Sequence, residues 1–166
     1  MRTVVVAAVA LLSSLVIAQA QTPTVSEAAI TQFGTLESHI TGKTGAPGVV
    51  GGNVQQGSYR FVSNATKMEA RKGLSFGFEY RLIGESNGAR VAIRKVTIFP
   101  APGLRNPKTG EVSARDEYIE NNVIGGLGMK AYSLDNEWEA VPGVWTQQIW
   151  FGEQKLGEQQ FTLTKP

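Results

Sequence analysis

The chain has 166 residues, which is room for one domain, and its formal net charge is +2. Hydrophobic residues make up 42% of it and charged residues only 18%, with 19 glycines, a mixture that favours strands joined by tight turns. Lysine and arginine form no run of five or more, so nucleic-acid binding is not indicated, and the absence of cysteine excludes disulfides, thiol catalysis and Cys-ligated metals.

The first twenty residues, 1–20, have the three-part pattern of a secretory signal peptide. Arg2 precedes an apolar run from Val4 to Ile17, and Ala18-Gln19-Ala20 is a small-x-small cleavage site. The run is too short to span a membrane comfortably, so we expect cleavage after Ala20 and no stable membrane anchor. The mature protein is then periplasmic or secreted.

The mature chain begins with residues 21–27, which are rich in Thr, Pro and Ser and predict a flexible arm. Residues 28–166 predict a single domain. Its first strand is expected within Ala28–Ile40, followed by a Gly-rich loop at Gly42–Gly52 and a second strand within Ser58–Thr66.

Gly73–Ile83 is the clearest strand of the sequence. Leu74, Phe76, Phe78, Tyr80 and Leu82 fall on one face, while polar residues and glycine fall on the other. Alternation of this kind predicts a strand with one buried face and one solvent-exposed face.

The rest of the chain continues the pattern of strands and turns. A Pro-rich loop at 100–110 must end the strand before it, because proline cannot donate a ladder hydrogen bond. Segment 134–141 is expected to be a turn that plugs one end of the core with Trp138. The further expected strands are 90–99, 111–123, 143–151 and 155–164.

These segments amount to about seven strands with no helices between them. That organisation predicts an all-β, antiparallel immunoglobulin-like β-sandwich. A small closed barrel is the alternative.

Motifs for nucleotide and metal chemistry are weak. Gly42-Lys43-Thr44 resembles the end of a phosphate-binding loop, but that motif needs a glycine where this chain has Glu37. His39 is the only histidine, and we interpret it as a strand residue. We therefore expect no cofactor, no metal and no catalytic residues.

Carboxylates offer an alternative function. Glu117 lies close to Glu120, and Glu137 to Glu139, with Asp116 beside the first pair. Two such groups in an enclosed cleft would favour a carbohydrate-active enzyme of the cell envelope. We interpret them otherwise as solvated residues.

A candidate binding surface comes from the aromatic and basic residues. Trp145 and Trp150 have opposite parity in one expected strand, so one indole should face the core and the other should face away. An outward tryptophan can stack on a sugar or anchor a partner. The residues of the candidate surface are Trp150, Trp138, Arg105 and Arg115. The arginines are expected otherwise to pair across strands with Glu79 or Glu117.

Two segments of the C-terminal half are distinctive: Trp138-Glu139-Ala140-Val141-Pro142-Gly143-Val144-Trp145 and Lys155-Leu156-Gly157-Glu158-Gln159-Gln160-Phe161. With them the chain resembles DUF3859, a family of bacterial exported proteins of unknown function. The resemblance covers about Ile30 to Thr164 and implies no catalytic residues.

The sequence as a whole favours a non-enzymatic binding or interaction module in the periplasm. Its expected partner is an envelope protein or an envelope glycan. A purely structural envelope protein is a further alternative. Neither the ligand nor the oligomeric state follows from the sequence.

Overall fold

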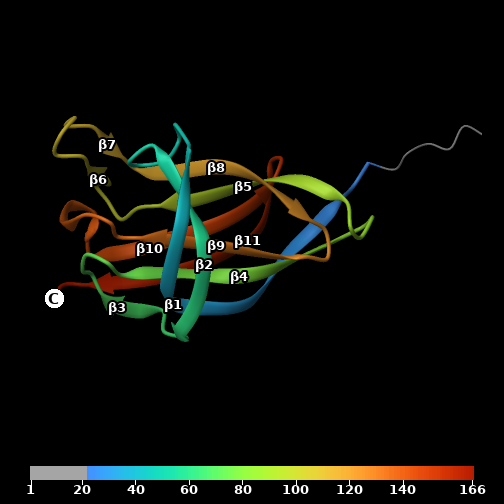
Figure 1. Ribbon diagram of the computed structural model, residues 1–166, viewed down its shortest axis with the longest axis horizontal. Coiled ribbons are helices and arrows are strands. Elements are labelled where there is room, and N and C mark those ends of the chain that lie inside the picture. The colour runs from blue at the N-terminus through green and yellow to red at the C-terminus, as the bar shows by residue number, and fades with distance from the viewer. Residues whose placement is uncertain (1–21) are drawn as a thin grey trace, which may run out of the picture.

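The computed structural model describes residues 22–166, and the predicted signal peptide lies outside them. These residues form strands and one 3-10 helix (Figure 1). None of their helices is long and apolar enough to cross a membrane. The elements are β1 (Val25–Gly45), β2 (Asn53–Ser63), β3 (Lys67–Glu69), β4 (Ser75–Gly84), β5 (Arg90–Ile98), β6 (Leu104–Arg105), β7 (Val112–Ser113), β8 (Arg115–Val123), β9 (Leu127–Ser133), η1 (Glu137–Glu139), β10 (Gly143–Phe151) and β11 (Gln154–Thr164).

Two sheets make the β-sandwich. One has the strand order β2-β1-β4-β9 and the other the order β3-β11-β10-β5-β8, while β6 and β7 form a separate ribbon. Every pairing is antiparallel except that of β3 with β11. The predicted antiparallel sandwich is confirmed. The sheets contain more strands than the seven expected, because β3 and β9 were not foreseen.

The core lies between the sheets and is built by the alternation seen in the sequence. On β4, Phe76, Phe78, Tyr80 and Leu82 are at most 1% exposed. From the opposite sheet, Trp145 of β10 packs its ring edge-on against Phe76, at a centroid distance of 5.6 Å. Burial of large aromatic surfaces is the main favourable term in folding such a domain.

Strand β1 is longer at both ends than expected. It begins at Val25, within the predicted arm, and runs to Gly45, within the predicted Gly-rich loop. Its first half pairs with β4 and its second half with β2. Gly34 lies where the partner changes: its φ is +140°, and a Cβ there would lie 1.8 Å from the carbonyl oxygen of Ser63. Only glycine fits this crossing.

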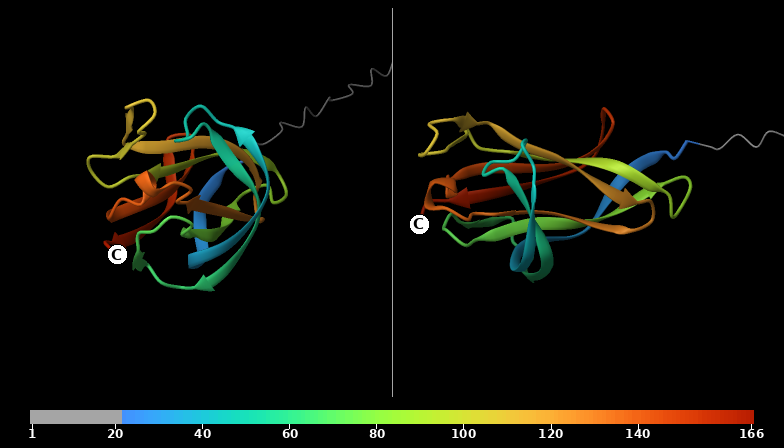
Figure 2. Two further views of the ribbon diagram at one scale, coloured as in Figure 1. Left: turned by 60° about the vertical axis from the view of Figure 1, so that its left-hand side comes forward. Right: turned by 45° about the horizontal axis from the view of Figure 1, so that its top comes forward.

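The second half of β1 and β2 form a hairpin that leaves its own sheet and crosses the sandwich. Figures 1 and 2 show the hairpin lying across the other strands, with its tip beside β8 of the opposite sheet. At the tip, the Glu117 amide donates to the Gly48 carbonyl oxygen at 2.8 Å. A Cβ on Gly48 would lie 2.5 Å from the Glu117 carbonyl oxygen, so glycine permits this close approach.

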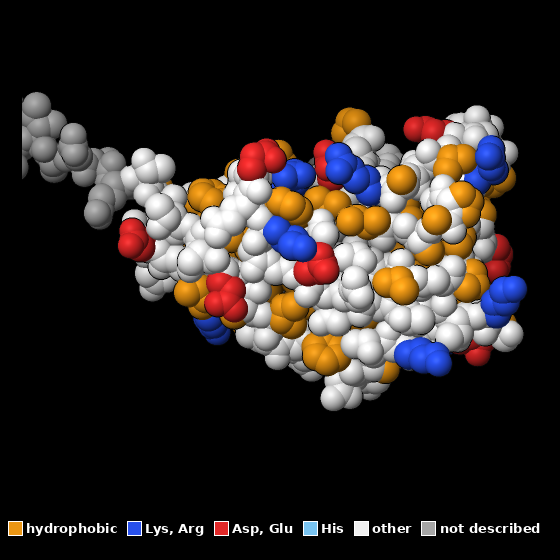
Figure 3. Space-filling view, turned by 180° about the vertical axis from the view of Figure 1, so that it is seen from behind, with side chains coloured by type: hydrophobic (Ala, Val, Ile, Leu, Met, Phe, Trp, Pro, Cys, Tyr) orange, Lys and Arg blue, Asp and Glu red, His pale blue; other side chains and the backbone are white. Residues whose placement is uncertain are grey.

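The face of the molecule opposite the view of Figure 1 has a mixed surface. On the face shown in Figure 3, acidic and basic side chains are interspersed among scattered hydrophobic ones.

The segment expected to close one end of the core contains η1, and Trp138 is half-buried against the core, as predicted.

Candidate functional site

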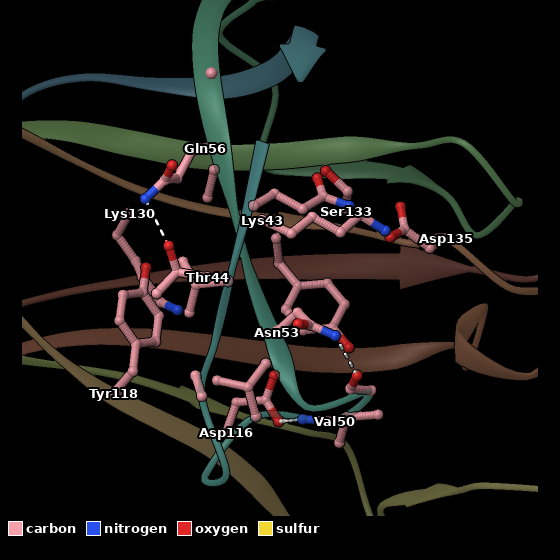
Figure 4. Close-up of a pocket in the computed structure, with 18 of the residues that line it drawn as sticks. Lys43, Thr44, Val50, Asn53, Gln56, Asp116, Tyr118, Lys130, Ser133 and Asp135 are labelled. Carbon is pink, nitrogen blue, oxygen red and sulfur yellow. Dashed lines mark hydrogen bonds between the residues drawn. The ribbon is translucent and has the colours of Figure 1, made fainter. Parts of the chain in front are cut away.

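A polar cleft of about 650 Å³ lies beneath the β1–β2 hairpin. The hairpin forms its cover, and strands β8 and β9, which are the edges of the two sheets, form its walls. Figure 4 shows Lys130 and Tyr118 together on one side and Ser133 and Asp135 on the other, with β1 and β2 crossing between them. We call this the hairpin cleft.

The walls of the hairpin cleft carry charged groups because of strand alternation. On β8, Asp116, Tyr118 and Glu120 are two residues apart and share the inward face. On β9, Lys130 and Tyr132 are also two residues apart and share the inward face of that strand. These two edge strands therefore place acids, tyrosines and a lysine against one another at the open side of the sandwich.

Two lysines are buried at this side, and each is 1% exposed. Lys95 of β5 pairs with Glu120 at 3.0 Å and donates to the Met129 carbonyl oxygen at 2.9 Å. Lys130 differs: its Nζ lies 4.9 Å from the centroid of the Tyr118 ring, and this Nζ makes no hydrogen bond or ion pair with any residue of 22–166. Burial lowers the pKa of Lys95, and it lowers the pKa of Lys130 to about 7.

Two carboxylates of the cleft are also buried, with Asp116 3% and Glu139 5% exposed. Burial raises the pKa of Asp116 to about 6, although its Oδ1 accepts a hydrogen bond of 2.7 Å from the Val50 amide. Burial likewise raises the pKa of Glu139, which accepts hydrogen bonds from Asn136 at 2.5 Å and the Tyr132 hydroxyl at 3.2 Å. Asp116 can therefore hold or release a proton near pH 6.

The hydrogen bond between Asp116 and Val50 ties the hairpin tip over the cleft. A hydrogen bond to a charged acceptor contributes about 1.5–3 kcal/mol, which corresponds to about a 10- to 100-fold change in a local opening equilibrium. We expect Asp116→Ala to accelerate hydrogen exchange of the Val50 amide by that factor, measured by NMR. Asp116→Asn keeps an acceptor oxygen and should show a smaller acceleration; equal exchange in all three proteins would contradict this role.

The four residues of the candidate surface predicted from sequence lie elsewhere. None of Trp150, Trp138, Arg105 and Arg115 lines the hairpin cleft. Trp150 lies under the Arg94 guanidinium, 4.9 Å from its ring centroid, and donates to Gln148 at 3.0 Å. The Arg105 guanidinium donates to the Gly110 carbonyl oxygen at 2.9 Å within the β6–β7 ribbon.

The predicted cross-strand pairing of an arginine with Glu117 is confirmed for Arg94 of β5, which lies 3.8 Å from this carboxylate on β8. Arg115 lies 3.2 Å from the same carboxylate, but both residues belong to β8. His39 is exposed on β1, and no group of metal-ligating side chains occurs within residues 22–166. Lys43 and Thr44, from the motif resembling a phosphate-binding loop, are strand residues that line the cleft.

Of the carboxylates considered from sequence, Asp116, Glu120 and Glu139 line the cleft. This meets the condition under which the enzymatic alternative gains weight. Sequence reasoning missed Lys130 because the segment after Gly128 was not assigned to a strand. The alternation of Gly128, Lys130 and Tyr132 was the available signal, since it places a lysine on an inward face.

Among solved structures, the fold resembles an immunoglobulin-like protein from Pseudomonas aeruginosa, with a TM-score of 0.57 and 22% sequence identity over 89% of this chain and 99% of that one. A β-glucosidase from Listeria innocua in complex with glucose reaches a TM-score of only 0.35, at 8% identity over 77% of this chain and 16% of that one, and carries no argument. No family model and no curated protein matches the chain. The protein therefore has an immunoglobulin-like fold, and its function has to be argued from its own residues.

Proposed function

We propose that the protein is a binding module whose ligand is a small polar molecule held in the hairpin cleft. The observation that carries this proposal is a cleft of about 650 Å³ in which Lys130 and Asp116 are almost completely buried. Charged groups are costly to bury, and a volume of 300–1,000 Å³ is typical of small-molecule sites.

The chemistry of the lining favours a ligand rich in hydroxyl groups. Asn53, Gln55 and Gln56 of β2 present amides, and Tyr59 and Tyr118 contribute a phenol from each side. Such groups donate and accept hydrogen bonds and offer flat apolar faces, which suits a sugar ring. An envelope glycan fragment is the ligand class that fits both this lining and the expected export.

NMR titration with methyl glycosides of N-acetylglucosamine tests the proposal. We expect chemical-shift changes at the amides of Val50, Tyr118 and Lys130, and about tenfold weaker binding in Tyr59→Ala, which loses one hydrogen-bonding aromatic wall. Trp150→Ala is the matched control on the outer face and should bind as the original protein does. Shifts that disappear in Trp150→Ala but persist in Tyr59→Ala would overturn the cleft as the site.

Export to the periplasm is part of the proposal, supported by the pattern in residues 1–20. N-terminal sequencing of the protein from the periplasmic fraction of a bacterial host should find Gln21 first. A protein that keeps Met1 and stays with the cytoplasmic fraction would contradict it.

Membership in DUF3859 is likewise proposed, on the segments Trp138–Trp145 and Lys155–Phe161.

A carbohydrate-active enzyme is the second candidate. The observation in its favour is that the pKa of Asp116 is raised to about 6 and that of Glu139 is also raised, in the same cleft. A general acid needs such a pKa. Hydrolysis of nitrophenyl glycosides that is lost in Asp116→Asn would establish the enzymatic function. No hydrolysis by the original protein would contradict it and favour the binding module.

A further inference from the structure

Two buried lysines, Lys130 in the lining of the cleft and Lys95 outside that lining, differ in their contacts. Lys95 and Lys130 have the same exposure of 1%, so burial alone does not distinguish them. Lys95 has its charge balanced by Glu120 and donates to a backbone carbonyl oxygen. Lys130 Nζ lies against the ring of Tyr118 and has no hydrogen bond or ion pair within residues 22–166. Because Lys130 also lines the cleft, a ligand there would meet an amine that has no hydrogen-bond or ion-pair partner to displace.

The surroundings of Lys130 favour its uncharged form. Burial is the largest cause of its pKa near 7, the nearby Lys95 charge acts in the same direction, and Asp116 opposes them. At neutral pH about half of a group with this pKa is a neutral amine, against about one in three thousand for an ordinary lysine. A desolvated lysine beside a second cation is a known way to make a nucleophilic amine. The other titratable and charged groups that line the cleft are Lys43, Tyr59, Asp116, Tyr118, Glu120, Tyr132, Asp135 and Glu139, and Lys95 acts on Lys130 from outside this lining.

We propose that Lys130 captures aldehyde-bearing ligands in the hairpin cleft as a reversible imine. The amine nitrogen forms a bond to the carbonyl carbon, and the carbonyl oxygen takes up a proton to give a carbinolamine. Loss of water then breaks the carbon–oxygen bond and leaves the carbon–nitrogen double bond, with no change in oxidation state. This inference rests on the proposed function, because the cleft must admit a ligand.

Asp116 is the group placed to move the proton. It faces the same cleft from β8, and its pKa of about 6 leaves a fraction of it protonated at neutral pH. Its acid form can protonate the departing oxygen, and its carboxylate can accept the proton that the amine loses. The open-chain form of a reducing sugar is an aldehyde, so the ligand class agrees with a cleft lined for hydroxyl groups.

Reductive trapping tests the proposal on the unmodified protein. Glycolaldehyde forms the imine with a lysine amine, and cyanoborohydride at pH 7 reduces this imine to a stable secondary amine. Peptide mass spectrometry measures the rate of modification at each lysine. We expect Lys130 to react at least tenfold faster than the exposed Lys72 and Lys108, with a pH midpoint near 7. Reaction at Lys130 no faster than at the exposed lysines would overturn the proposal.

Lys95 is the matched internal control, because it is equally buried but engaged by Glu120. It should stay unlabelled, and labelling of both lysines at one rate would overturn a specific role for Lys130. The result is also separable from the proposed function, since the methyl glycosides of N-acetylglucosamine cannot open to an aldehyde. Their binding without trapping at Lys130 would overturn the imine alone, and failure of both would overturn both.

Discussion

Trp145→Ala is expected to lower the free energy of unfolding by about 3–5 kcal/mol, measured by urea denaturation followed by circular dichroism. The indole is fully buried and lies 5.1 Å, between ring centroids, from both Phe99 and Tyr132. Its Nε1 donates to the Val141 carbonyl oxygen at 3.0 Å. Alanine would leave a cavity between the two sheets and an unpaired carbonyl group, and the sheets cannot collapse to fill it.

Trp150→Ala is the matched control, because it removes the same side chain from the same strand. Trp150 is only partly buried and stacks on Arg94 at 4.9 Å, so its loss should cost about 1 kcal/mol. Equal losses in the two variants would contradict the orientation of β10 described above.

Between pH 7.5 and 9.5, the free energy of unfolding of the protein is expected to rise by about 2 kcal/mol. Lys130 has a pKa of about 7 when folded, against an ordinary value of 10.5. Through this window the unfolded state therefore binds one more proton than the folded state. One such proton changes stability by about 1.4 kcal/mol per pH unit. The stability that the neutral Lys130 side chain contributes above pH 10.5 is therefore lost as the pH falls from 10.5 toward 7, and the loss is complete below pH 7.

The other buried groups do not reverse this sign. Burial also lowers the pKa of Lys95, which acts in the same direction. The raised pKa of Asp116 favours folding at low pH, but its effect develops between the values 3.8 and about 6, below the window. The raised pKa values of Tyr118 and Tyr132 reduce stability only near pH 10 and above, where unfolded tyrosines ionise.

Urea denaturation at a series of pH values measures the effect, and Lys130→Met isolates it. Methionine keeps a long apolar side chain without the charge, so the rise should fall below about 1 kcal/mol. Lys72→Met, at an exposed position, should leave the rise unchanged. An undiminished rise in Lys130→Met would show that another group is responsible.

Local patterns in the sequence were sufficient for the β-sandwich. The alternation from Leu74 to Leu82 predicted the buried face of β4, and the proline after Phe99 predicted where β5 ends. The opposite parity of Trp145 and Trp150 predicted that one indole is in the core and the other faces away, and the structure shows that Trp145 is the buried one. Each of these depends on residues close together in the chain, because a strand's faces are set by its own period of two.

The hairpin cleft depended on the tertiary structure. The sequence shows that Asp116, Lys130 and Glu139 are ionisable. It does not show that β8 and β9 are the edge strands of the two sheets on the same side of the sandwich. Nor does it show that β1 changes partner at Gly34 and carries its hairpin over that side. The burial of these charged groups, and the pKa shifts that burial causes, arise from contacts between segments that are distant in the chain. The spacing of residues in the sequence does not predict such contacts.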